Sequence, residues 1–320
     1  MSTASAYWSP LVKQLAPYVP GEQPKAENLV KLNTNENPYG PSPAVYQAIQ
    51  QQMAAGVLAH VFQGLLKHEK PLLFPDLTYS FYPVYCRLFQ IPYRCIPLDD
   101  RYTIQVDDYF CENGGIIFVN PNAPTGIYLE ISEVERLLQA NRDSVVVVDE
   151  AYIDFGGESS VSLTRKYENL LVIQTLSKSR SLAGLRVGFA VGNPNLIEAL
   201  NRVKNSFNSY PVDRLAIAGG AAAMRDRDHV KKTSEKIIAT RTWLAGALVQ
   251  RGFVVLPSMT NFLMAKPQSM GAAELTAKLR EHGILIRHFQ QQRVEDFVRI
   301  TIGTDDECTY LLEIIDKITQ

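Results

Sequence analysis

Buried-strand patterns alternate with helix patterns along most of the chain. Four consecutive valines at 145–148 and the apolar, β-branched run at 170–173 each fit a strand that is covered on both faces. Between such runs, apolar residues three and four positions apart predict amphipathic helices, as at 57–66, and a crossover helix is expected at 130–141. This alternation predicts an α/β fold, with a large domain built on a mostly parallel sheet flanked by helices.

The expected elements continue to the end of the chain. Further strands are expected at 71–74, 93–97, 116–119, 187–191, 252–256, 261–265, 284–287 and 298–302, and further helices at 43–53, 79–89, 194–204, 214–224, 226–250, 272–282 and 306–318. The last four strands and the last two helices form a compact α+β unit. We expect residues 28–205 to form the large domain, and residues 1–27 and 206–320 to form the small domain with an N-terminal arm.

Composition narrows the class of protein. The chain has 320 residues, of which 46% are hydrophobic and 20% charged, as in an ordinary soluble globular protein of about two domains. The net charge of −1 argues against nucleic acid or an anionic membrane surface as a partner. The start of the sequence lacks a signal-peptide pattern, and no apolar run is long enough to span a membrane. The cysteines and histidines lack metal-ligand spacing, so we expect a cytoplasmic protein without a bound metal.

Two polar side chains follow the predicted buried strands. Asp149 comes directly after the four valines, and Lys178 lies in a polar turn shortly after the run at 170–173. Ligands of open α/β sheets bind at the carboxyl ends of the strands, so both side chains are placed to face one cavity. Pyridoxal phosphate (PLP) chemistry needs such a pair, a lysine for the Schiff base and an acid that keeps the pyridine nitrogen protonated. The alternative for Lys178 is an ordinary exposed turn lysine.

Several motifs carry a resemblance to a known family. The motifs are Asn-Pro-Asn-Ala-Pro-Thr-Gly at 120–126, Asp-Glu-Ala-Tyr at 149–152, Ser177-Lys178 with Arg186, and Arg-Ile-Thr-Ile-Gly at 299–303. In this order they resemble aminotransferases of the aspartate aminotransferase fold, the fold-type I PLP-dependent transferases. The segments at 32–41 and 283–289 are typical of the histidinol-phosphate aminotransferase branch of that family.

The resemblance implies PLP as the cofactor and assigns roles to individual residues. Lys178 holds PLP and moves a proton as base and acid, Asp149 pairs with the pyridine nitrogen, and Tyr152 contacts the phenolic oxygen and lowers the pKa of the Schiff base. The other implied cofactor contacts are Tyr79 stacked on the ring, Asn122 at the phenolic oxygen, and Ser177 and Arg186 at the phosphate. The implied substrate contacts are Arg299 at the anionic end, Tyr18 near the substrate phosphate, and Asn35.

Several of these residues also have an alternative structural role that involves no cofactor or substrate. Tyr18 and Tyr79 also suit packing roles, Asn35 and Asn122 suit turns in which an asparagine bonds its own backbone, and Arg299 suits a surface cation. The implied reaction is transamination of histidinol phosphate, made from imidazole acetol phosphate with glutamate as amino donor, by a homodimer. The alternatives are an aromatic or other amino acid as substrate, decarboxylation of a phosphorylated threonine, and a PLP-binding protein without turnover.

The resemblance is interrupted between Gly56 and Val57. There the family has a loop whose tyrosine reaches the neighbouring subunit, then a helix, a strand and a Gly-Asn-Gly-Ser turn that cradles the cofactor phosphate. None of these is present, and no Ser, Thr, Asp or Asn precedes Val57 as a helix cap. We predict an intact protein heavier than 35.8 kDa by about 30 residues, one strand–helix unit. A mass of 35.8 kDa would mean a true deletion, with impaired PLP binding and little or no activity.

Overall fold

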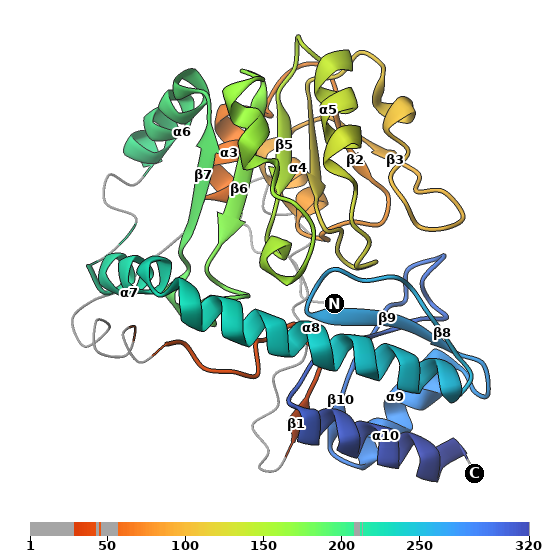
Figure 1. Cartoon of the computed structure of the whole chain (residues 1–320). Helices are drawn as coiled ribbons and strands as arrows, with labels where there is room; N and C mark the ends of the chain where they lie inside the picture. Colours follow the sequence, from red (N-terminus) through yellow and green to blue (C-terminus); the bar gives the residue numbers. More distant parts are fainter. Residues whose placement is uncertain (1–28, 43–44, 46–56, 208–211, 213, 320) are drawn as a thin grey trace, which may run out of the picture.

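A mostly parallel sheet forms the centre of the larger unit (Figure 1). The computed structural model describes residues 29–42, 45, 57–207, 212 and 214–319. The strand order in the sheet is β3-β2-β4-β5-β6-β7, in which only β7 runs antiparallel to its neighbour. The strands span Leu72–Pro75 (β2), Tyr93–Ile96 (β3), Gly115–Val119 (β4), Val146–Asp149 (β5), Leu170–Thr175 (β6) and Gly188–Gly192 (β7). The predicted sheet is therefore confirmed.

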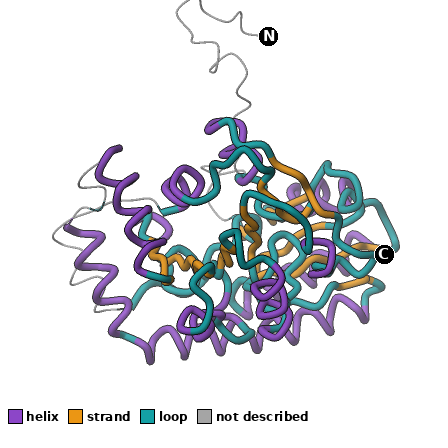
Figure 2. Tube along the Cα trace, turned by 90° about the horizontal axis from the view of Figure 1, so that it is seen from above, coloured by secondary structure: helices purple, strands orange, loops and turns teal. Residues whose placement is uncertain are grey.

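Helices cover both faces of this sheet, and the strands lie between them in the view from above (Figure 2). The helices of this unit are α3 (Leu58–Gly64), α4 (Tyr82–Phe89), α5 (Ile131–Ala140) and α6 (Pro194–Phe207). The side chains of successive strand residues point to opposite faces of the sheet, so they pack in two different hydrophobic cores. Ile117 and Val147 pack with Phe62 of α3, whereas Phe118 and Val148 pack with α5. Burial on both faces explains the uninterrupted apolar runs of β4 and β5.

A second, smaller sheet belongs to the C-terminal unit. Its antiparallel strand order is β11-β12-β9-β8, and β1 and β10 form a separate parallel pair. The elements of this unit are β1 (Val30–Lys31), β8 (Phe253–Val255), β9 (Phe262–Pro267), α9 (Ala272–Glu281), β10 (Ile284–Leu285), β11 (Arg287–His288), β12 (Val298–Thr301) and α10 (Asp305–Thr319). The predicted strand at 284–287 is thus divided into β10 and β11.

The long helix α8 (Arg227–Gln250) runs past both units (Figure 1). Its buried Arg241 donates through Nη1 to the carbonyl of Phe155 at 2.9 Å and to the carbonyl of Thr260 at 2.6 Å. Phe155 belongs to the larger unit, and Thr260 precedes β9 of the smaller unit. The Arg241 guanidinium therefore makes hydrogen bonds to both units. Burial lowers the pKa of Arg241 to about 10, which leaves the side chain charged at neutral pH.

Two regions differ from the expected domain boundaries. The expected large domain begins at residue 28, but Val30 and Lys31 pair with β10 of the smaller unit. Helix α7 (Arg214–Arg225) lies in the expected small domain, yet its Ala216 packs in a cluster with Leu176 and Leu182 beside the larger sheet. These contacts join residues far apart in the chain, so local sequence patterns did not predict them. Tyr18 and, except for residue 45, the expected helix at 43–53 lie outside the described residues.

Candidate active site

A cavity of about 340 Å³ lies at the carboxyl ends of the parallel strands. Val119 ends β4, Asp149 ends β5 and Thr175 ends β6, and all three line the cavity. Ligands bind at this edge in open α/β sheets. The sequence-predicted residues on the cavity wall are Tyr79, Asp149, Tyr152, Ser177, Lys178 and Arg186. The structure therefore brings together five side chains from two separate motifs and the ring of Tyr79.

Asp149 is a buried acid at the wall of this cavity, with 7% of its surface exposed. The Tyr82 hydroxyl donates to its Oδ2 at 3.1 Å, and the Ala151 backbone N–H donates to its Oδ1 at 3.2 Å. Burial raises the pKa of Asp149 to about 6, although both hydrogen bonds lower it. A cationic group of a ligand beside this carboxylate would favour the charged form and would be held strongly.

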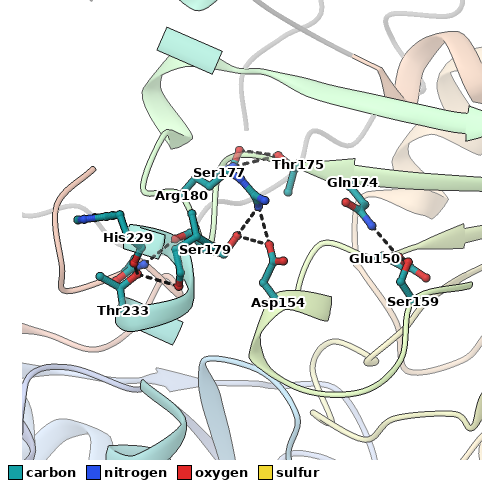
Figure 3. A network of polar contacts seen from close by, with 12 residues as sticks. Glu150, Asp154, Ser159, Gln174, Thr175, Ser177, Ser179, Arg180, His229 and Thr233 are labelled. Carbon is teal, nitrogen blue, oxygen red and sulfur yellow. Dashed lines mark hydrogen bonds and ion pairs between the residues drawn. The ribbon is translucent and has the colours of Figure 1, made fainter. Parts of the chain in front are cut away.

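The adjacent acid, Glu150, points into a different environment (Figure 3). Its carboxylate accepts hydrogen bonds from the Ser159 hydroxyl at 2.6 Å, the Ser160 backbone N–H at 2.6 Å and the Gln174 amide at 2.8 Å. Burial raises the pKa of Glu150, and these hydrogen bonds oppose that shift. Because adjacent side chains leave a strand end in different directions, Asp149 lines the cavity while Glu150 anchors the loop that follows.

Lys178 lies half-buried in the turn after β6, with its Nζ 5.7 Å from the centroid of the Tyr152 ring. The two residues after Lys178 attach this turn to the segment that follows Tyr152 (Figure 3). The Ser179 hydroxyl donates to the carboxylate of Asp154, and the Arg180 guanidinium donates to the same carboxylate at 2.6 Å. The lysine is thus carried by a fixed turn, which predicts a defined position for its amine.

Asn35 connects the smaller unit to the cavity. Its side-chain amide donates to the Tyr152 hydroxyl at 3.1 Å, and its backbone N–H donates to the Thr301 hydroxyl at 2.9 Å. The carbonyl of Asn35 accepts from the Asn261 amide at 3.1 Å. The Tyr152 ring packs edge-on against Phe262, with ring centroids 5.3 Å apart. Residues of the smaller unit therefore fix the position of the Tyr152 hydroxyl of the larger unit.

Hydroxyl and guanidinium groups gather at another part of the cavity wall. The Thr175 hydroxyl donates to the Ser177 hydroxyl oxygen at 2.8 Å, and the Ser177 backbone N–H donates to the Thr175 hydroxyl at 3.2 Å. Arg186 is exposed and donates to the carbonyl of Ala183 at 3.0 Å. These groups suit a phosphate dianion. Thr175 was not predicted, because a threonine at a strand end is common. Helix α3 also reaches this wall, and Val57 at its start makes no side-chain capping hydrogen bond.

Tyr79, Asn122 and Arg299 are placed differently from one another. Tyr79 lines the cavity with 36% of its surface exposed, as a stacking ring requires. Asn122 is buried away from the cavity wall, and its amide donates to the Leu77 carbonyl and the Thr125 hydroxyl, both at 3.0 Å. Arg299 of β12 also lies off the wall, where it donates to the carbonyl of Asn33 at 3.2 Å. A role for Asn122 or Arg299 thus requires a ligand that reaches beyond this cavity.

Known proteins are similar in sequence to this chain over nearly its full length. The family model for aminotransferases of class I and II matches residues 54–315. Histidinol-phosphate aminotransferase 1 of Pseudomonas fluorescens is 55% identical to the chain, over 97% of the chain and 98% of that protein. Histidinol-phosphate aminotransferase 1 of Methylococcus capsulatus is 53% identical, over 98% and 97% respectively. This chain belongs to the histidinol-phosphate aminotransferase family.

Solved structures of family members confirm the fold. Histidinol-phosphate aminotransferase from Sinorhizobium meliloti, in complex with PLP, superposes with a TM-score of 0.86 at 21% identity, over 99% of each chain. The enzyme from Clostridium acetobutylicum superposes with a TM-score of 0.83 at 18% identity, over 91% of this chain and 99% of that one. At these identities the likeness concerns the fold, which is the predicted fold-type I architecture.

The alignment with the P. fluorescens histidinol-phosphate aminotransferase spans 344 positions. This family member has only 320 residues. That relative therefore contains residues that have no counterpart here. Their placement between Gly56 and Val57 stays a prediction. The greater mass that we expect for the intact protein stays a prediction.

The cavity residues of this family member fit PLP. A buried carboxylate suits the pyridine nitrogen, the Lys178 amine suits the aldehyde carbon, and the Thr175, Ser177 and Arg186 groups suit the phosphate. Tyr79 supplies an exposed ring for stacking. Among the residues that the structure describes, no cluster of three or more His, Cys, Asp or Glu side chains is placed to hold a metal ion. Within the same residues, no helix is long and apolar enough to cross a membrane.

Proposed function

We propose that this protein is a PLP-dependent aminotransferase that interconverts histidinol phosphate and imidazole acetol phosphate in histidine biosynthesis. Glutamate and 2-oxoglutarate are the second substrate pair. The observation that carries the proposal is the placement of Lys178 and Asp149 on the wall of one cavity. The 55% identity to a histidinol-phosphate aminotransferase supports this substrate over the other substrates of the fold.

PLP, when bound, supplies an electron-withdrawing ring that stabilises negative charge on the substrate carbon beside the amino group. Lys178 is the residue whose Nζ would hold the cofactor covalently. The same Nζ would serve as the base that takes the proton from the substrate Cα and as the acid that gives a proton back.

The remaining residues bind and orient. Asp149 would place a negative charge beside the pyridine nitrogen and would keep that nitrogen protonated, and the positive charge on the nitrogen would in turn favour the ionised form of this buried acid. The Tyr152 hydroxyl, held by Asn35, would donate to the phenolic oxygen of the cofactor. Thr175, Ser177 and Arg186 hold the cofactor phosphate, and Tyr79 stacks on the ring. Arg299 would bind the anionic end of the substrate, with Tyr18 and Asn35 as further substrate contacts, and the Asn122 amide would contact the phenolic oxygen of the cofactor.

A half-reaction screen tests this function. The PLP-loaded protein is mixed with histidinol phosphate, phenylalanine or O-phosphothreonine, and conversion of the cofactor to its pyridoxamine form is followed by absorbance. We expect rapid conversion with histidinol phosphate, one imidazole acetol phosphate released per cofactor, and no conversion by Lys178→Ala. Faster conversion with phenylalanine would assign an aromatic amino acid aminotransferase. Carbon dioxide release from O-phosphothreonine would assign a decarboxylase, and absence of any conversion would indicate a PLP-binding protein without turnover.

We also propose a cytoplasmic homodimer. The family relatives of this chain are histidinol-phosphate aminotransferases by name, and histidinol phosphate is a small molecule. Light scattering on the PLP-loaded protein tests the assembly, with twice the chain mass expected. A monomer that turns over histidinol phosphate would exclude the homodimer while leaving the reaction in place.

A further inference from the structure

Tyr82, which our sequence predictions did not include, lies behind the cavity wall at the start of α4. Its side chain is fully buried, with 0% of its surface exposed. Its hydroxyl donates to Oδ2 of Asp149 at 3.1 Å. Tyr82 is therefore separated from the cavity by the two side chains that it contacts, Asp149 and Tyr79.

Aromatic neighbours hold the Tyr82 ring in place. The ring packs edge-on against Tyr79, with centroids 5.7 Å apart and an interplanar angle of 86°. On other sides it contacts Phe74 at 6.0 Å and Phe62 at 5.7 Å, both from the core of the larger unit. Edge-to-face contacts of this kind favour one ring orientation. A buried ring fixed on several sides cannot turn its hydroxyl away from Asp149 without disturbing the core.

We propose that Tyr82 is a positioning residue for the transamination reaction. Its hydroxyl orients the Asp149 carboxylate toward the pyridine nitrogen, and its ring edge sets the tilt of the Tyr79 ring against the cofactor. One side chain outside the cavity thus aligns two of the groups that contact PLP. This role rests on the proposed function, because it concerns the residues that hold the cofactor of that reaction.

The hydrogen bond also affects the charge of Asp149. Burial raises the pKa of this carboxyl, and the Tyr82 hydrogen bond lowers it more than the Ala151 N–H does, whereas nearby Glu150 raises it. Lys178 and Tyr152 face Asp149 across the same cavity. Burial, and then the neighbouring Asp149, raise the pKa of Tyr82 well above its ordinary value, so the phenol stays protonated. Tyr82 is therefore a permanent donor that favours the ionised form of Asp149.

A double-mutant cycle tests the proposal with the variants Tyr82→Phe, Asp149→Asn and the two combined. Phenylalanine keeps the ring contact with Tyr79 and removes only the hydroxyl. In the PLP-loaded protein, we expect Y82F to lower kcat about 10-fold with little change in KM, as expected from the loss of a hydrogen bond to a charged group. In the D149N background the same substitution should change kcat by less than about 2-fold, because there is no charge left to position.

The cofactor-free protein supplies a readout that is independent of turnover. In the wild-type protein, the free energy of unfolding falls as pH rises and Asp149 ionises in the folded state. The substitution Y82F should raise the pKa of Asp149 in the folded protein, so the upper end of this fall should move to higher pH. An additional variant, Tyr82→Leu, removes the ring edge and should weaken PLP binding more than Y82F does. Equal PLP affinity in Y82F and Y82L would remove the role in tilting Tyr79.

Other outcomes separate this proposal from the proposed function. Wild-type turnover together with an unchanged kcat in Y82F would overturn the positioning role and leave the reaction intact. An unshifted pH dependence of the cofactor-free Y82F protein would overturn it as well, even if the wild-type protein fails to turn over histidinol phosphate. If Y82F does not fold, rescue of folding by D149N supports the same coupling. A double variant that also fails to fold would make Tyr82 a purely structural residue.

Discussion

The side-chain amide of Asn35 donates a 3.1 Å hydrogen bond to the hydroxyl of Tyr152. Asn35 follows β1 of the smaller unit, and Tyr152 follows β5 of the larger one. The same Asn35 side chain accepts a hydrogen bond from Thr301 at 3.1 Å. Its backbone has a φ of 54°, in the left-handed region that asparagine and glycine tolerate best. The contact between the two units therefore passes directly through a predicted cofactor-binding hydroxyl.

Two substitutions distinguish the effect of losing the Asn35 amide from the effect of straining the backbone at this position. Asn35→Gly accepts the positive φ but lacks the amide, whereas Asn35→Ala lacks the amide and adds about 1 kcal/mol of backbone strain. We expect both variants to lose kcat about 10-fold, the effect of one buried hydrogen bond. Only N35A should lose the additional stability, measured by urea unfolding. Wild-type kcat in N35A would show that the amide does not position Tyr152.

Asp149→Asn should keep the fold and lose most activity. An amide matches the shape of the carboxylate and still accepts a hydrogen bond from Tyr82, but it carries no charge to stabilise a protonated pyridine nitrogen. We expect kcat to fall by about 10²–10³-fold, as for removal of a single preorganised electrostatic group. Circular dichroism checks the fold. The mechanism loses Asp149 if the variant turns over near the wild-type rate.

The stability of the cofactor-free protein should depend on pH through Asp149. The pKa of this carboxyl is about 6 in the folded protein and lower in the unfolded chain. The protonated carboxyl therefore stabilises the folded protein fully at pH values below the pKa of the unfolded chain. This stabilisation is lost as pH rises through about 6. The total loss is about 3 kcal/mol. Urea unfolding between about pH 4 and pH 8 should show this loss in wild type but not in D149N. Equal pH dependence in the two proteins would contradict the assignment.

Arg299 offers a test of substrate binding. Its guanidinium packs over the Phe262 ring at 5.2 Å and the Phe289 ring at 5.6 Å, which holds the cation in a partly buried position. We expect Arg299→Ala to weaken binding of the anionic substrate by about 2–5 kcal/mol, the effect of leaving a buried anion unpaired. Arg299→Lys is the control that keeps the charge. Unchanged apparent affinity for every phosphorylated and carboxylated substrate would exclude this role.

The sequence predicted the elements well because their patterns are local. The valines of β5 and the alternating strands and helices follow from burial on both faces of a parallel sheet, and the structure confirms them. Lys178 and Asp149 were predicted on one cavity because both follow neighbouring strands. By contrast, β1 has two residues and pairs with β10, more than 250 positions away, so no local pattern indicates it.

The contacts that support the site were not predictable in the same way. The hydrogen bond from Tyr82 to Asp149 joins the start of α4 to the end of β5, and that from Asn35 to Tyr152 joins the two units. Both depend on the packing of distant segments. The direction of the Asn122 amide toward Leu77 is likewise decided by tertiary packing.

Reductive trapping of the cofactor tests the central claim most directly. Borohydride reduces an imine between PLP and a lysine to a stable amine, so the cofactor mass stays on the lysine that held it. We predict that peptide mapping of the reduced protein finds this mass on Lys178, and that Lys178→Ala gives no labelled peptide. A label on another lysine, or none on wild type after incubation with PLP, would contradict the assignment of this cavity as the cofactor site.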